Sequence, residues 1–165
     1  MFESKLPSAT AMLLAVSLTA FGLGGCTVAA PADEQAQKAD KATQDQKKLQ
    51  GTWIMMAEED QGRTLPEDVL QKRFRLVIEG AKWTLKETQG PERKEWKVKL
   101  DGTKSPKQGD FTYLFGNNKG KVAFAIYELN GDALKLCIAE PGESRPMKFD
   151  GKGKNTLILF KRAKL

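Results

Sequence analysis

Histidine is absent from the 165 residues of this chain. Imidazole is the commonest general base and metal ligand near neutral pH, so its absence excludes Ser-His-Asp and Cys-His catalysis. Beyond the N-terminal region the serines are Ser105 and Ser144, and neither lies in a G-x-S-x-G motif. Catalysis would have to use carboxylates, lysine, tyrosine or Cys137. We therefore predict that the protein is not an enzyme, with a carboxylate-dependent hydrolase as the alternative.

Motifs for metals and cofactors are missing from the sequence as well. It has no Gly-rich phosphate loop, no C-x-x-C pair and no cluster of metal-ligating residue types. We expect no metal and no cofactor.

The sequence also lacks a dense basic block. Its 27 Lys and Arg residues exceed its 21 Asp and Glu residues, for a net charge of +6, but the charges are interleaved along the chain. A nucleic-acid-binding protein more often concentrates its basic residues among exposed aromatics. We expect no nucleic-acid partner. The Lys-containing segments 104–107 and 119–121 are interpreted as solvated faces, with contact to anionic lipid or polysaccharide as the alternative.

One apolar run is present, close to the N-terminus. No charged residue lies between Lys5 and Asp33, and residues 10–25 read TAMLLAVSLTAFGLGG. A membrane-spanning helix needs about 20 apolar residues, so this shorter run better matches a signal peptide. The letters LGGC, which end at Cys26, resemble the bacterial lipobox; this implies cleavage before Cys26 and attachment of diacylglycerol to its sulfur. Cleavage after Ala30 and an uncleaved anchor are the alternatives.

The second cysteine, Cys137, matters for the assignment of Cys26. Two cysteines in an exported chain would first suggest a disulfide, but lipidation of Cys26 leaves Cys137 without a partner. Cys137 lies in the apolar run ALKLCIAE, where we interpret it as a small buried hydrophobe, with a reactive thiol as the alternative. The acyl chains would hold the protein in the bacterial cell envelope, facing the periplasm or the exterior.

The chain divides into three segments by composition. Residues 1–25 form the predicted signal peptide. Residues 26–48 contain no aromatic side chain and almost no large aliphatic one, so they cannot bury enough apolar surface to fold alone and are predicted to be a flexible tether. Residues 49–165 have the composition of one folded domain.

This domain consists of short alternating runs separated by turn residues. Asn130 and Gly131 divide two apolar runs, which is the strongest local signal for a hairpin. One helix is expected at 64–72, where Thr64 and Glu67 have capping-box spacing. The candidate strands read TWIMMAE, FRLVIEG, KWTLKET, EWKVKLD, FTYLFG, KVAFAIYEL, ALKLCIAE, MKFD and TLILFKR. The pattern predicts an all-β protein: a small antiparallel barrel of about eight strands, or a sandwich, with one short helix after the first strand.

Several stretches resemble an uncharacterised lipocalin-like domain family common in planctomycete proteins. They read LQGTW, SPK with Asp110 after it, NKGK, IYELNGDALKLCIAEPGESRPMKF and a closing FKR, and together they span 49–162. Gly109 departs from the family pattern, which has an aliphatic residue there. The resemblance implies a calycin-type, lipocalin-like barrel and no particular activity.

The resemblance also implies a structural role for residues at the two ends of the domain. The G-x-W motif of Gly51 and Trp53 is similar to that of lipocalins, where a basic residue near the chain end, here Lys161 or Arg162, lies over the indole. Such a cation–π contact contributes about 0.5 to 2 kcal/mol and would close one end of the barrel.

Large aromatic residues are the candidate ligand-binding groups. We predict that Trp83, Trp96, Phe124 and Tyr127, with Arg145, line an interior site for a small apolar ligand. The alternative is that the aromatics fill the core and that the domain acts through its surface, as a structural or protein-interaction module in the envelope.

The polar residues of the matching stretches have two interpretations. Asp110, Asp132, Glu140, Glu143 and Arg145 would form a polar rim or a carboxylate pair if they met at one barrel mouth. We favour separate structural roles, in which Asp132 shapes the Asn-Gly turn and Arg145 pairs with a carboxylate below the loop.

Overall fold

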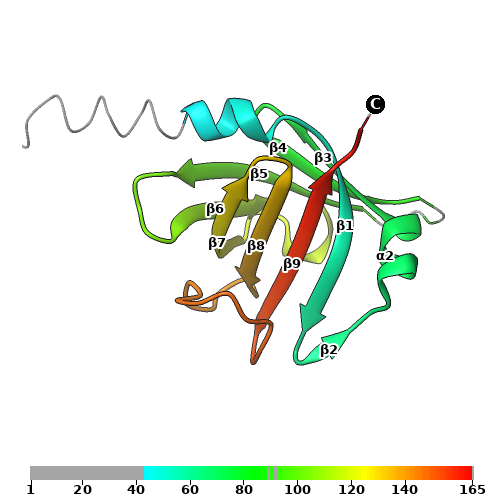
Figure 1. The fold of residues 1–165 in the computed structure, drawn as a ribbon. Helices are drawn as coiled ribbons and strands as arrows, with labels where there is room; N and C mark the ends of the chain where they lie inside the picture. Colours follow the sequence, from blue (N-terminus) through cyan, green and yellow to red (C-terminus); the bar gives the residue numbers. More distant parts are fainter. Residues whose placement is uncertain (1–42, 89, 91–92, 165) are drawn as a thin grey trace, which may run out of the picture.

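The computed structural model describes residues 43–88, 90 and 93–164, and in them the main element is a closed antiparallel barrel. Eight strands each pair with their neighbours in sequence order, and the last strand pairs with the first to close the sheet (Figure 1). These strands are β1 (Gly51–Asp60), β3 (Phe74–Glu79), β4 (Lys82–Glu87), β5 (Arg93–Asp101), β6 (Lys107–Tyr113), β7 (Val122–Asn130), β8 (Ala133–Ala139) and β9 (Asn155–Arg162). The prediction of a small antiparallel barrel is confirmed.

The strands alternate between inward apolar and outward polar side chains, as the period-two pattern indicates. In β5 the inward side chains are Trp96, Val98 and Leu100, which are buried, whereas Lys97 and Lys99 are exposed. The hairpin expected at Asn130 and Gly131 joins β7 to β8, and Gly131 has a φ of 55°. A positive φ of this kind is the reason that glycine suits the turn.

A β-bulge interrupts the alternation in β1. Met55 faces Phe160 of β9 and Ala57 faces Leu159, so Met56 is the extra residue. The insertion shifts the phase of the side chains by one position. Before the bulge Trp53 and Met55 point into the core; after it Glu58 and Asp60 point into the barrel.

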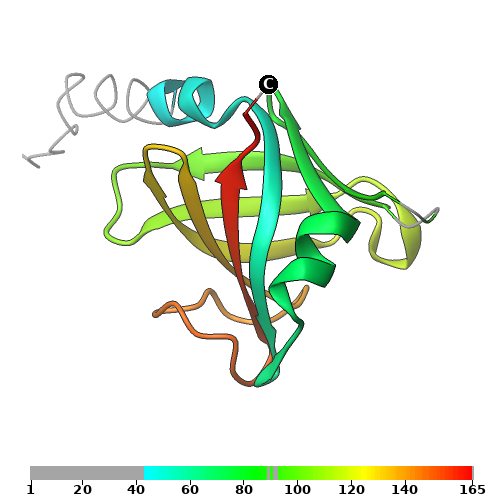
Figure 2. The same cartoon turned by 45° about the vertical axis from the view of Figure 1, so that its right-hand side comes forward.

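Two further elements lie between β1 and β3. The short strand β2 (Arg63–Thr64) forms a hairpin with β1, and helix α2 (Glu67–Arg73) follows it beside the barrel (Figure 2). The predicted helix is therefore present, but its predicted capping box is not. Thr64 belongs to β2, and the N-cap residue is Pro66, which has no side-chain hydrogen bond to offer the helix.

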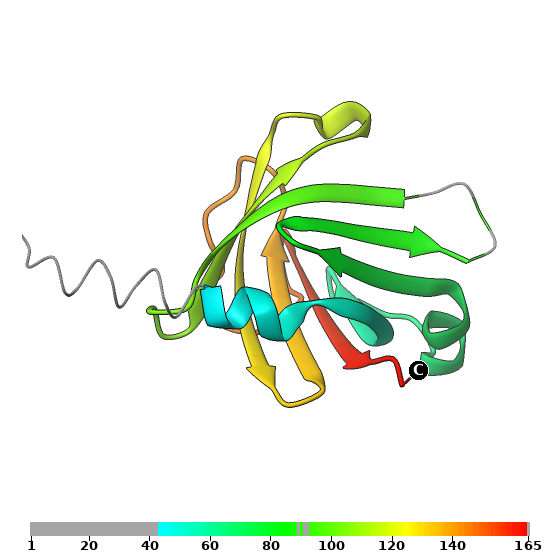
Figure 3. The same ribbon diagram turned by 90° about the horizontal axis from the view of Figure 1, so that it is seen from above.

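Part of the predicted tether belongs to the folded domain. Residues 43–49 are helical, and this helix crosses one end of the barrel (Figure 3). Asp45 and Leu49 are 6% and 0% exposed. The domain thus includes residues before Leu49, because this helix buries Asp45, which composition assigned to the tether. The remainder of the tether, 26–42, lies outside the described residues, as do the signal peptide and Cys26.

Residues 140–154 join β8 to β9 and are called here the strap (Figure 1). The run MKFD, 147–150, was expected to be a strand, but it lies in the strap and forms none. Arg145 holds the strap to the sheet: its Nη1 donates to the carbonyl oxygens of Gly109 (2.9 Å) and Ala125 (2.6 Å). The strap, held in this way, covers apolar side chains on the outer face of the sheet.

Gly109, the residue that departs from the family pattern, lies under an aromatic ring. A Cβ atom at this position would come within 3.0 Å of Cε2 of Phe111 and 3.4 Å of Cδ2 of Leu100. Phe111 is 1% exposed. Its ring therefore takes the space that an aliphatic side chain at position 109 would fill.

Candidate functional site

The two ends of the barrel differ. At one end lie the helical residues 43–49, the C-terminal part of β9 and the tight β3–β4 and β7–β8 turns; this is called here the closed end (Figures 1 and 3). At the other end β1 leads to β2, β6 leads to the 3₁₀ turn η1 (Gly116–Asn118), and β8 leads to the strap. This second end is called here the mouth.

The closed end brings together Gly51, Trp53 and Arg162. The guanidinium carbon of Arg162 lies 4.2 Å from the ring centroid of Trp53. Its Nη1 also donates to the Gln50 carbonyl (2.7 Å), and a Cβ atom at Gly51 would lie 3.5 Å from it. The indole N–H of Trp53 donates to the Leu49 carbonyl (2.8 Å). Arg162, rather than Lys161, is thus the basic residue over the indole.

A buried polar cluster fixes the helical residues 43–49 to this end. The carboxylate of Asp45 accepts hydrogen bonds from Lys107 Nζ (2.7 Å) and from the Tyr127 hydroxyl (2.8 Å). Burial first, then the hydrogen bond to Asp45 and its negative charge, raise the pKa of Tyr127 well above its usual range. Tyr127 therefore serves to hold the helix onto the barrel.

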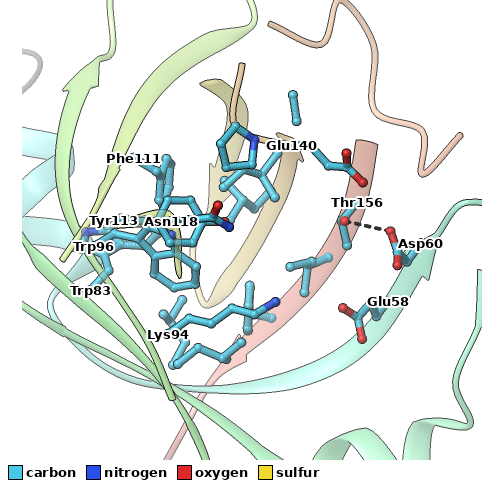
Figure 4. Close-up of a pocket in the computed structure, with 18 residues that line it drawn as sticks. Glu58, Asp60, Trp83, Lys94, Trp96, Phe111, Tyr113, Asn118, Glu140 and Thr156 are labelled. Carbon is cyan, nitrogen blue, oxygen red and sulfur yellow. Dashed lines mark hydrogen bonds between the residues drawn. The ribbon is translucent and has the colours of Figure 1, made fainter. Parts of the chain in front are cut away.

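A cavity of about 430 Å³ occupies the interior near the mouth (Figure 4). Its inner part is lined by buried residues that include Trp83, Phe111 and Leu136, and its rim includes the exposed residues Asp60 and Glu140. The cavity is therefore open to solvent at one side and apolar at the other, which is the usual form of a small-molecule site.

Five aromatic side chains line the cavity, and four of them contact one another and are called here the aromatic wall: Trp83, Trp96, Phe111 and Tyr113. Phe111 packs edge-to-face against Trp83, with ring centroids 5.2 Å apart, and against Trp96 at 5.9 Å. The indole N–H of Trp83 is buried and has no hydrogen-bond partner among the described residues, whereas Trp96 interacts with the Tyr113 hydroxyl. A buried donor without an acceptor costs about 1 to 3 kcal/mol, so an acceptor supplied by a ligand would be favourable here.

The rim of the cavity is mainly acidic. Glu58, Asp60 and Glu140 contribute carboxylates, and Lys94 contributes the one ammonium group among the lining residues (Figure 4). Asp60 accepts a hydrogen bond from the Thr156 hydroxyl (3.0 Å). Burial raises the pKa of Glu58, Lys94 opposes this effect and Asp60 adds to it. The Glu58 carboxylate is therefore poorly solvated and would gain from a cation.

The structure divides the predicted ligand-binding residues into two groups. Trp83 and Trp96 line the cavity. Phe124, Tyr127 and Arg145 do not line it. Tyr127 lies in the core next to the closed end. Phe124 lies on the outer side of β7, where its ring centroid is 4.9 Å from the guanidinium carbon of Arg145. Arg145 and Phe124 thus form part of the attachment of the strap.

The polar residues of the matching stretches do not meet at the mouth as one group. Arg145 Nη2 pairs with Asp110 below the strap, whereas Asp132 accepts a hydrogen bond from Arg162 Nε (3.0 Å) at the closed end. Glu143 pairs with Lys154. Only Glu140 lines the cavity.

Sequence reasoning missed the other rim residues for a definite reason. Glu58 and Asp60 face inward only because the bulge at Met56 shifts the phase of β1, and no local residue pattern predicts that bulge. Lys94 lies two residues before Trp96, so the alternation of β5 placed it on the inward face. That signal was available from the sequence.

Cys137 is buried, and its thiol donates to the Asp150 carbonyl (3.2 Å). Burial raises the pKa of this thiol, which makes it a poor nucleophile. Among the described residues there is no group of side chains suited to hold a metal ion. In the same part of the chain, no helix is long and apolar enough to cross a membrane.

Comparison with known proteins does not assign a function to this site. No family model matches the chain, and no curated protein matches it. The resemblance to the planctomycete lipocalin-like family stays a prediction that rests on the stretches quoted above.

Proposed function

We propose that the barrel binds a small, largely apolar ligand in its interior cavity. The observation that carries the proposal is the cavity itself: about 430 Å³, with an aromatic wall and an opening to solvent. Ligand sites in proteins usually begin at about 300 Å³. The alternative function, a filled barrel that acts only through its surface, would need an interior packed shut.

The direct test blocks the cavity without changing the outer surface. Ile138 lines the cavity and is partly buried, so Ile138→Trp would place an indole in the space. Leu159 is 38% exposed on the neighbouring strand β9 and faces outward, so Leu159→Trp is the matched control. The probe is N-phenyl-1-naphthylamine, an uncharged dye whose fluorescence rises in apolar sites.

We expect one dye molecule to bind per chain, with affinity reduced at least about tenfold by Ile138→Trp, a loss of about 1.4 kcal/mol, and unchanged by Leu159→Trp. Thermal unfolding of both variants checks that the barrel is intact. Equal dye binding by the wild-type chain and by Ile138→Trp would contradict the proposal, as would no binding by the wild-type chain.

We propose further that the chain is an envelope lipoprotein, attached by diacylglycerol on Cys26. The support is the LGGC sequence and the composition of the segment after it. The proposal includes no catalytic step; partners would be the membrane, the ligand and other envelope proteins.

A further inference from the structure

We infer that the ligand of this cavity is a cationic amphiphile, with an amine group at the mouth and an apolar body against the aromatic wall. This inference rests on the proposed ligand-binding function and adds the charge of the ligand.

The first argument is the charge of the cavity lining. Among the described residues, three carboxylates and one ammonium group line it, for a net charge of −2, whereas the whole chain carries +6. Further cations surround the lining: the charge of Glu140 helps to raise the pKa of Lys154, Arg63 faces Asp60 across the β1–β2 ladder, and Lys121 Nζ donates to Oδ1 of Asn118 (3.2 Å). The acidic excess is therefore confined to the side chains that line the cavity.

The second argument is that, within the described part of the chain, no carboxylate of the cavity lining is held in a direct ion pair. Within the described part of the chain, neither Asp60 nor Glu140 forms an ion pair, and Asp60 has only the Thr156 hydroxyl as a partner. The Glu58 carboxylate is half-buried, and only the charge of Lys94 opposes the rise in pKa that burial causes. A partly desolvated carboxylate such as that of Glu58 favours a cation more strongly than a carboxylate in bulk water.

The third argument is the aromatic wall. Trp83, Trp96, Phe111 and Tyr113 line one side of the cavity, and Glu58, Asp60 and Glu140 line the other (Figure 4). Their faces suit an alkyl body, and aromatic faces also attract ammonium groups.

An anionic amphiphile is the main competing ligand, because Lys94 is well placed to meet a carboxylate at the mouth. Lys94 already acts on Glu58, where it opposes the effect of burial. A fatty-acid carboxylate at this position would also lie near Asp60 and Glu140, which would repel it. The competing ligand therefore meets more repulsion than attraction.

The test compares three probes that share one alkyl chain: octylamine, 1-octanol and octanoate. Each is titrated into the full chain carrying Cys26→Ser, which needs no detergent, and binding is followed by tryptophan fluorescence and calorimetry at neutral pH. We expect octylamine to bind at least about tenfold more tightly than octanoate, with octanol between them.

Single variants then assign the preference to the rim. Glu58→Gln and Glu140→Gln should each weaken octylamine binding about threefold to tenfold and leave octanol binding unchanged, which also shows that the barrel is folded. Glu79→Gln, which removes an exposed carboxylate next to the closed end, is the matched control and should change neither.

The outcomes separate the two proposals. Octanoate binding as tightly as octylamine would overturn the cationic preference but leave ligand binding standing, and so would octylamine binding that neither rim variant weakens. If none of the three probes binds, the ligand-binding function itself is wrong and the inference fails with it.

Discussion

Arg162 connects three separate parts of the chain at the closed end. It lies over Trp53, donates to the Gln50 carbonyl at the end of the N-terminal helix, and donates to Asp132 in the β7–β8 turn. Lysine can supply the positive charge but not the planar group with several donors. The geometry of the guanidinium, rather than its charge, should therefore matter for stability.

We predict that Arg162→Lys lowers the free energy of unfolding by about 2 kcal/mol, measured by urea unfolding. Arg73→Lys is the control, because Arg73 is 49% exposed and forms a surface pair with Glu87, so its replacement should cost less than about 1 kcal/mol. Wild-type stability in Arg162→Lys would show that charge alone closes this end.

Tyr127 gives a prediction about pH. Its pKa is raised by burial and by Asp45, so the folded state holds the phenolic proton more tightly than the unfolded state, whose pKa is about 10. The stabilisation is complete below pH 10 and is lost as the pH rises. Between pH 8 and pH 11 the wild-type chain should lose about 1 kcal/mol more stability than Tyr127→Phe. Parallel losses in the two chains would rule out this contribution.

The sequence predicted part of the site at the residue level. Alternation placed Trp83 and Trp96 on the inward face, where they line the cavity. It could not separate them from Tyr127, which also points inward but lies next to the closed end. Phe124 and Arg145 do not line the cavity. Phe124 lies half-buried on the outer face of β7 below Arg145 of the strap, and residue type alone does not tell which face a loop covers.

Asp45 attaches the N-terminal helix to two strands of the barrel. Asp45 accepts hydrogen bonds from Lys107 and Tyr127, which lie on different strands. Replacing it leaves a buried hydroxyl without its acceptor, at a cost of about 1 to 3 kcal/mol.

We predict that Asp45→Ala releases this helix while the barrel stays folded. Hydrogen exchange should become faster at the amides of 43–49 and remain slow in the barrel strands. Asp68→Ala, at an exposed position of α2, should leave both exchange rates as they are. Uniform acceleration over the whole chain would show instead that helix and barrel unfold as one unit.

At the level of elements, the strands were predictable and their irregularities were not. Short alternating runs separated by turn residues indicated the barrel, because each strand has one face in the core. The bulge at Met56 and the path of the strap depend on contacts between distant segments, such as Arg145 with Gly109 and Ala125. The helix at 43–49 was missed for the same reason. Its composition is polar, and Asp45 is buried only because its hydrogen-bond partners lie far along the chain.

The two ends of the whole molecule differ: the N-terminal helix lies at one end of the barrel and the cavity at the other. For a lipoprotein, this arrangement would place the membrane attachment on the side where the chain enters and direct the mouth elsewhere. The predicted leader rests on a local signal, an apolar run that ends at LGGC.

We predict that the membrane fraction contains the chain in acylated form, starting at Cys26. Cys26→Ser should move it to the soluble fraction, and mass spectrometry of the N-terminal peptide should show the loss of the acyl chains. Cys137→Ser is the control, since Cys137 is buried in the barrel wall, and should leave the chain in the membrane. An unmodified wild-type chain that begins at Pro31 would refute lipidation.

Native mass spectrometry of the Cys26→Ser chain, purified without detergent from the cells that make it, tests ligand binding most directly. The account predicts a population heavier than the bare chain by the mass of one small molecule, and the absence of that population in the chain that also carries Ile138→Trp. A bare mass for the Cys26→Ser chain, or the same added mass in both chains, would contradict the claim that the interior cavity is a ligand-binding site.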